Sequence, residues 1–258
     1  MAYLKYDQKI PEPVRPLPEG KTEHANDRGT RIHSSCEDFI SGKASTLAPE
    51  ADKFFGPQIE LLRAMYADGI VSLEGEWAMN RSWDPVDWHG QWIEEPGAPA
   101  TSKVKTLPLY GKPGDTVAVG KRTYSWEPAW LRLKLDAAVF HSRQHATVID
   151  FKSGKKYGNE IKHGQQLQLY QLVTFLRYPL LERVDAELWY LDQNDTTKVS
   201  FTRAQGLRFH RTFDQQGREV TSDWVPTPNP SLNNCRFCPF GERPDGHGTG
   251  HCKRGVYK

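Results

Sequence analysis

The chain has 258 residues, 37% hydrophobic and 11% aromatic, which suits one sizeable packed domain with appendages and excludes wholesale disorder. The formal net charge of +2 excludes no class of partner, because nucleic-acid enzymes often confine positive charge to one channel. No apolar run reaches the roughly 18 residues of a membrane helix, and the polar, proline-rich residues 1–26 lack the apolar core of a secretory signal. We therefore expect a cytoplasmic protein that does not contact membranes.

The first half of the chain predicts an extended arm over residues 1–26, then two helices and a strand. Apolar residues recur at helical spacing within 27–43 and again over 58–67, whereas 71–79 alternates as a strand does. The tryptophan-rich stretch 80–125 is too long for an ordinary connection. We expect there an insertion that forms a small hairpin layer, packed by its tryptophans or lining a substrate groove.

The second half predicts a β-hairpin followed by a long amphipathic helix. Further elements follow, so that the expected series is strands over 129–140 and 146–152, a helix over 161–177, strands over 186–191 and 198–202, and a helix over 204–219. This order predicts an α/β fold with a mixed central β-sheet flanked by helices. We expect residues 27–222 to form that domain and residues 223–258 to form a cysteine-rich tail.

Two acidic residues and a lysine converge on the predicted hairpin. Asp150 and Lys152 are two apart on one strand, so their side chains project on the same face, and Asp136 lies on the strand paired with it. Carboxylates suit Mg²⁺ or Mn²⁺, and the main-chain carbonyl of Phe151 is a further candidate oxygen ligand. Such an ion can promote phosphodiester hydrolysis, with the lysine orienting the water or screening the phosphate. The alternative is that all three are solvated hairpin ends.

The patterns LKLDAAV, VIDFKSG and HGQQLQLY resemble the PD-(D/E)XK nuclease superfamily in its RecB-like exonuclease branch. The resemblance implies a restriction-endonuclease-like αβββαβ core with Asp136, Asp150 and Lys152 as catalytic residues. It also implies that Gln166 and Tyr170, which are four apart on one helical face, lie near the active site and bind DNA.

The predicted first helix carries a second part of the resemblance. RGTRIHSSCEDFISG is similar to the Gly-Thr-x-x-His-x-x-x-Glu opening of the RecB-like branch, which implies that His33 is a metal ligand and that Glu37 supports or ligates. Glu37 can also be a plain surface carboxylate, and Glu76 on the first strand is a weaker acidic candidate. Lys155 and Lys156 suit contacts with the DNA backbone beside such a site, or can simply form a solvated face.

Three of the four cysteines gather in the tail with two histidines: Cys235, Cys238, Cys252, His247 and His251. The cysteines with either histidine would complete a tetrahedral zinc site. The ending Cys-x-x-Cys-Pro-Phe also resembles relatives in which an iron–sulfur cluster fastens the C-terminus. Free structural thiols are a third reading. Cys36 stands apart, inside the predicted first helix, and its participation is doubtful.

These features predict a divalent-metal-dependent DNA nuclease. An exonuclease that processes DNA ends in recombination, repair or phage replication is favoured, with a single-strand annealing protein, a recombinase or a helicase as candidate partners. A structure-specific endonuclease is an alternative. A non-catalytic DNA-binding module on the same fold is another, although such a decayed nuclease would not need the complete set of Asp136, Asp150 and Lys152.

Overall fold

The structure is a computed structural model that describes residues 9–11, 17, 19–97, 104, 106–154, 156–222, 228–235, 238–242 and 248–256. By its internal contacts the chain divides into two compact units. One unit spans Ala25–Glu219, and the other combines Met1–His24 with Val220–Lys258. No helix in the described part of the chain is long and apolar enough to cross a membrane.

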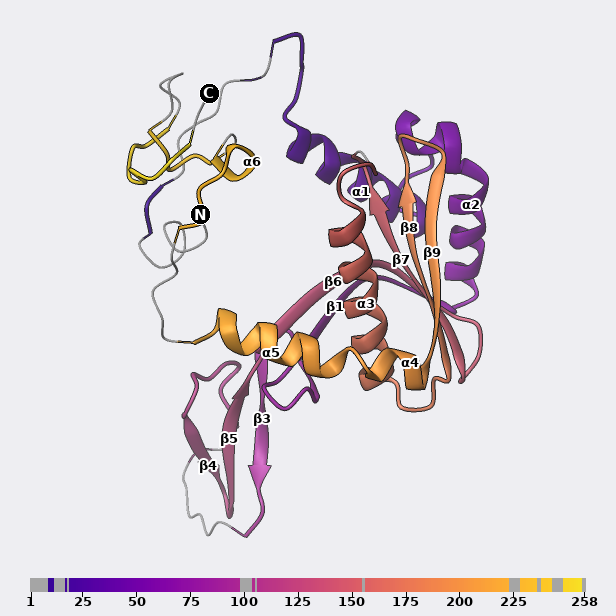
Figure 1. The fold of residues 1–258 in the computed structure, drawn as a ribbon. Helices are drawn as coiled ribbons and strands as arrows, with labels where there is room; N and C mark the ends of the chain where they lie inside the picture. The colour runs from indigo at the N-terminus through magenta and orange to yellow at the C-terminus, as the bar shows by residue number, and fades with distance from the viewer. Residues whose placement is uncertain are drawn as a thin grey trace. The chain divides into compact units, whose positions relative to one another are not determined.

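A six-stranded mixed sheet organises the unit Ala25–Glu219 (Figure 1). Its spatial order is β2 (Pro85–Val86), β1 (Val71–Met79), β6 (Leu131–Phe140), β7 (His145–Lys152), β8 (Arg183–Tyr190) and β9 (Asp195–Thr202). The strands β7 and β8 pair in parallel, and α3 (Glu160–Arg177) connects them, whereas every other neighbouring pair in this sheet is antiparallel. The predicted mixed sheet and the β6–β7 hairpin are therefore confirmed.

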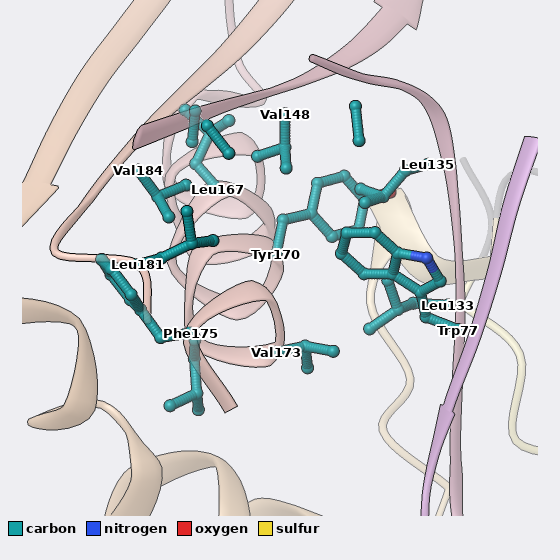
Figure 2. Packing of buried hydrophobic residues seen from close by; sticks show 14 of the residues in the cluster. Trp77, Leu133, Leu135, Val148, Leu167, Tyr170, Val173, Phe175, Leu181 and Val184 are labelled. Carbon is teal, nitrogen blue, oxygen red and sulfur yellow. The ribbon is translucent and has the colours of Figure 1, made fainter. Parts of the chain in front are cut away.

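Helices cover the two faces of this sheet. Consecutive residues of β7 point to opposite faces, and Val148 packs in the cluster that contains the apolar side of α3, while Ile149 packs in the cluster with α1 (Ala25–Ile40) and α2 (Pro49–Ala67). Figure 2 shows the first of these clusters, where Tyr170 of α3 lies among aliphatic and aromatic side chains of the strands. Two layers of core thus hold β7, which carries the Asp-x-Lys motif, in a fixed position.

The tryptophan-rich insertion forms a second, three-stranded sheet with the order β3 (Gly90–Glu95), β5 (Arg122–Pro128) and β4 (Thr116–Val119). The rings of Trp92 and Trp126 lie 5.2 Å apart in an edge-to-face arrangement. Trp126 is buried, and the indole nitrogen of Trp92 donates to the carbonyl oxygen of Pro108 at 2.8 Å. The expected small layer packed by its tryptophans is therefore present.

Two predicted helix boundaries were wrong. The helix expected over 58–67 begins at Pro49 and continues through Pro57, because Phe55, Ile59 and Leu62 bury one continuous apolar face. Gly56-Pro57 resembles a helix start, since proline favours the first turn. The proline in the first turn of α2 is Pro49 instead. The single helix expected over 204–219 is two helices, α4 (Arg203–Leu207) and α5 (His210–Val220).

The described part of the second unit contains one short helix, α6 (Leu232–Cys235), and an isolated parallel bridge between Gly241 and Cys252. The side chain of Phe240 is fully buried there. The amide of Cys252 donates to the carbonyl of Phe240 at 2.6 Å, so the end of the tail folds back onto the segment that follows Cys238.

Candidate active site

Asp136 connects helix α1 to strand β7. One of its carboxylate oxygens, Oδ1, lies 2.9 Å from Nδ1 of His33, which α1 presents toward the sheet. The other, Oδ2, accepts a hydrogen bond from the main-chain amide of Phe151 at 2.5 Å. The predicted ligands His33, Asp136 and Phe151 are therefore neighbours, although His33 and Asp136 are 103 residues apart in the sequence.

Asp150 is the buried centre of the site, with 8% of its side chain exposed. Its Oδ1 accepts from the hydroxyl of Tyr170 at 2.9 Å and from Nε2 of Gln166 at 3.0 Å. Its Oδ2 lies 2.6 Å from Nζ of Lys152 but has no hydrogen bond of good geometry. Residues of α3 thus orient Oδ1 of Asp150, whereas Oδ2 interacts with the charge of Lys152.

The hydroxyl of Tyr170 has two acceptors within reach, Oδ1 of Asp150 and the carbonyl of Lys134 at 3.1 Å. Because a phenol carries one proton, it donates to one of them at a time. Nε2 of Gln166 lies 2.6 Å from the same hydroxyl and can donate to it. Tyr170 is 7% exposed and belongs to the core (Figure 2), so its hydroxyl faces the carboxylate and not the solvent.

The pKa values of these groups follow from burial and charge. Burial raises the pKa of Asp150, and the charge of Asp136 adds to this, against the opposing effect of Lys152. Burial lowers the pKa of His33, but its hydrogen bond with Asp136 and the charges of Asp136 and Asp150 outweigh burial, so the net shift is upward. The shift of Asp150 thus reflects mainly its burial, and that of His33 the carboxylates beside it.

The donor set fits a hard divalent cation. Among the described residues, no three or more His, Cys, Asp or Glu side chains converge closely enough to hold a metal ion as they stand. The buried Oδ2 of Asp150, which lacks a hydrogen bond, is an atom that a cation would satisfy. Carboxylates with an imidazole and a main-chain oxygen suit Mg²⁺ or Mn²⁺.

Other predicted residues lie outside this hydrogen-bonded group. Glu37 is one turn from His33 on α1, and its carboxylate lies 3.4 Å from Nζ of Lys43. Glu76 is about half exposed and pairs with Lys134 at 2.9 Å. Nζ of Lys156 lies 2.8 Å from Asp195, over the ring of Tyr190. Lys155 and His247 lie outside the described residues.

Sequence reasoning missed Glu74 on strand β1. This residue has a left-handed backbone conformation, with φ at 44°. Burial raises the pKa of its carboxyl, and the nearby charges of Asp136 and Glu37 raise it further. Alternation within 71–79 placed Glu74 on a strand, but only the pairing of β1 with β6 brings it beside Asp136.

No disulfide joins Cys235, Cys238 and Cys252 in the described part of the tail. The amide of Cys238 donates to the carbonyl of Cys235 at 3.0 Å, so the main chains of these two cysteines lie side by side. Cys252 lies in the bridge with Gly241, and His251 next to it is exposed. Cys36 belongs to the other unit, where it is fully buried in the apolar cluster between α1, α2 and the sheet.

Two carboxylates, a lysine and a histidine gathered on a mixed α/β sheet are the components with which hydrolases cleave phosphodiesters using divalent ions. The sequence profile of the PD-(D/E)XK nuclease superfamily matches residues 2–243, and the chain belongs to this superfamily. Its members are generally metal-dependent nucleases.

Comparisons beyond the family add little. A solved structure described as "Crystal structure of SSO0001" aligns with 82% of this chain and 77% of its own at 14% identity. Its TM-score of 0.29 is too low to inform the fold or the function. No curated protein matches the chain significantly.

Proposed function

We propose that this chain is a DNA exonuclease that depends on Mg²⁺ or Mn²⁺ and processes DNA ends, with residues 27–222 as its catalytic domain. The observation that carries the proposal is the buried Asp150. One of its oxygens is held by Tyr170 and Gln166, while the other faces Lys152 without a hydrogen bond. A carboxylate kept charged in this way costs stability, and a catalytic cation explains why it is retained.

His33, Asp136, Asp150 and the carbonyl of Phe151 would hold the ion. When bound, Mg²⁺ or Mn²⁺ supplies Lewis-acid stabilisation of the charge that develops on the phosphate. The hydrogen bond between Asp136 and the amide of Phe151 supports this assignment, because it fixes the main chain between Asp150 and Lys152. Glu37 would support His33 from the next turn of α1.

Lys152 would act on the water and the phosphate. Its side chain is 23% exposed and its Nζ lies 2.6 Å from Asp150, so it can donate to a phosphate oxygen or orient a water at the mouth of the site. Gln166 and Tyr170 would hold Asp150 in register, with the half-buried Gln166 nearer to DNA. Lys155 and Lys156 would contact the DNA backbone. The ion pair of Lys156 with Asp195 is partly exposed, so Lys156 could exchange it for a phosphate at modest cost.

The process and partners are proposed from the RecB-like resemblance. The order along the chain of the helix with His33, the strand with Asp136, the strand with Asp150 and then α3 supports this resemblance. End processing in recombination, repair or phage replication would couple the nuclease to a single-strand annealing protein, a recombinase or a helicase.

The test is a cleavage assay on end-labelled linear DNA and on closed circular DNA, with Mn²⁺ and with a chelator. We expect nucleotides to be released from linear ends in Mn²⁺, circular DNA to survive, and Lys152→Ala to lose activity. Lys53→Ala, an exposed lysine on α2, is the matched control and should remain active. Cleavage of circular DNA would show that the protein is an endonuclease and not an exonuclease. DNA binding without any cleavage would favour a non-catalytic module.

We further propose that the tail holds a structural metal, either Zn²⁺ or an iron–sulfur cluster, through Cys235, Cys238 and Cys252, with His247 or His251 completing a zinc site. The hydrogen bond between Cys238 and Cys235 and the bridge at Cys252 support this, because they place cysteines distant in the sequence within one small unit. Metal analysis and an absorbance spectrum after anaerobic purification test it. Stoichiometric zinc supports the zinc site, and a visible sulfur-to-iron absorption band supports the iron–sulfur cluster. Metal-free protein with an intact tail overturns both proposals.

A further inference from the structure

The pairing of β1 with β6 is interrupted at one position. The register runs from Val71 opposite Val139 to Met79 opposite Leu131, and it includes Leu73 opposite Ala137 and Gly75 opposite Leu135. Between these two pairs, Glu74 and Asp136 are opposite each other but do not pair. Opposed positions of an antiparallel ladder are close neighbours, and the carboxylate of Glu74 interacts electrostatically with that of Asp136, so the two residues lie side by side.

In both strands, residues of the same parity change from one face of the sheet to the other at this point. In a regular strand, residues of one parity share a face. In β1, Val71 packs in the cluster with α1 and α2, but Trp77 packs in the cluster with α3. In β6, Ala137 packs in the cluster with α1 and α2, whereas Leu135 packs in the cluster with α3. The left-handed conformation of Glu74 accounts for the change of face in β1.

Glu74 has two acidic and two basic neighbours, and the acidic pair Asp136 and Glu37 has the larger effect on its carboxyl. Its carboxylate interacts electrostatically with Asp136, Glu37 and His33. The lysine that faces it is Lys134, whose Nζ lies 3.7 Å from Glu74 but 2.9 Å from Glu76. Like charges that are directly opposed across strands destabilise a sheet. Glu74 therefore has an unfavourable backbone conformation and lies beside a carboxylate of like charge. A divalent cation bound between the two carboxylates would relieve their repulsion.

We propose that Glu74 is a further carboxylate ligand for divalent cations at this site, acting jointly with Asp136. The inference rests on the proposed metal-dependent nuclease. It has independent support from Asp150, whose Oδ2 is buried without a hydrogen bond and which also interacts with the charge of Asp136. Asp136 is thus the common neighbour of two carboxylates, Glu74 and Asp150.

The test is Mn²⁺ binding to the full chain without DNA, measured by calorimetry or by the loss of the free-ion paramagnetic resonance signal. Glu74→Gln should weaken Mn²⁺ binding by about 10-fold or more. Glu60→Gln removes the same charge from an exposed position on α2 and should change Mn²⁺ binding by no more than about twofold. Glu74→Asp, which keeps a carboxylate, should bind better than Glu74→Gln.

Thermal unfolding of the metal-free variants gives a second readout. The repulsion between the carboxylates of Glu74 and Asp136 destabilises the metal-free protein, so Glu74→Gln should raise its melting temperature. The increase in melting temperature that Mn²⁺ produces should be smaller in Glu74→Gln than in wild type. Unchanged Mn²⁺ binding in Glu74→Gln, or a lowered metal-free melting temperature with normal Mn²⁺ binding, would overturn the proposal. A wild-type chain that binds no Mn²⁺ would instead overturn the proposed function.

Discussion

The hydroxyl of Tyr170 lies 2.9 Å from Oδ1 of Asp150, and this contact joins the buried side of α3 to the end of β7. Tyr170 also packs in the core below the site (Figure 2). The helix that fills the core therefore also orients the carboxylate. The second oxygen of Asp150 remains available on the side of Lys152.

Tyr170→Phe should lower the turnover of DNA by about 10-fold, which corresponds to the loss of one hydrogen bond to a charged group, and leave DNA affinity unchanged. Gln166 still donates to Asp150, so some orientation is kept. Single-turnover kinetics and DNA-binding titrations separate the two effects. Tyr157→Phe changes an exposed ring and serves as the control. Weakened DNA binding with normal turnover would mean that Tyr170 contacts DNA directly.

Two helical glycines should respond in opposite ways to alanine. A Cβ at Gly206 would lie 2.0 Å from Oε1 of Gln171 and 2.6 Å from the ring of Phe175, so Gly206→Ala should lower the free energy of unfolding by about 2 kcal/mol through overpacking. A Cβ at Gly164 in α3 meets nothing within 4 Å, and Gly164→Ala should raise it by about 0.5–1 kcal/mol. Denaturant unfolding measures both. Equal effects would contradict the packing of α4 on α3.

Asp185 should make stability depend on pH. Burial raises its pKa, but hydrogen bonds from Ser200, Arg183 and His145 outweigh burial and hold the pKa well below its usual range. A lowered carboxyl pKa contributes stability above the pKa of the unfolded aspartate, about 3.9. That stability is lost as the pH falls toward the folded pKa.

Asp185→Asn should therefore lower the free energy of unfolding by about 2 kcal/mol near neutral pH and by clearly less at about pH 3. Denaturant unfolding at several pH values checks this, with the exposed Asp87→Asn as the control. A loss that is the same at every pH would show that packing, and not charge, is responsible.

Cys36 should be inert in the folded protein. It is fully buried, and burial raises the pKa of its thiol to about 12. A thiol reagent applied to metal-free protein near neutral pH should modify Cys238 and Cys252, which are partly exposed, and reach Cys36 only on unfolding. In Cys235→Ala, which lacks the other buried cysteine, this late phase should come from Cys36 alone, and Cys36→Ala in the same background should remove it. Rapid modification of Cys36 in the native state would contradict its place in the core.

The sequence could predict the strands and helices in which one periodicity dominates. The hairpin with Asp136 and Asp150 and the helix with Gln166 are of this kind. The start of α2 could not be predicted, because Gly56-Pro57 imitates a helix start while tertiary packing carries the helix through Pro57. The role of Glu74 could not be predicted either, since it depends on strand register and on a single left-handed residue.

The central claim is that Asp150 serves a metal-dependent cleavage of DNA, and Mn²⁺-dependent cleavage by wild type and by Asp150→Asn tests it most directly. We predict that wild-type cleavage rises with Mn²⁺ and stops with a chelator, and that Asp150→Asn loses at least about 100-fold in rate. The variant should remain folded, with equal or higher stability without metal, because burial disfavours the charge that asparagine lacks. Cleavage by Asp150→Asn at the wild-type rate, or wild-type cleavage that needs no metal, would contradict the claim.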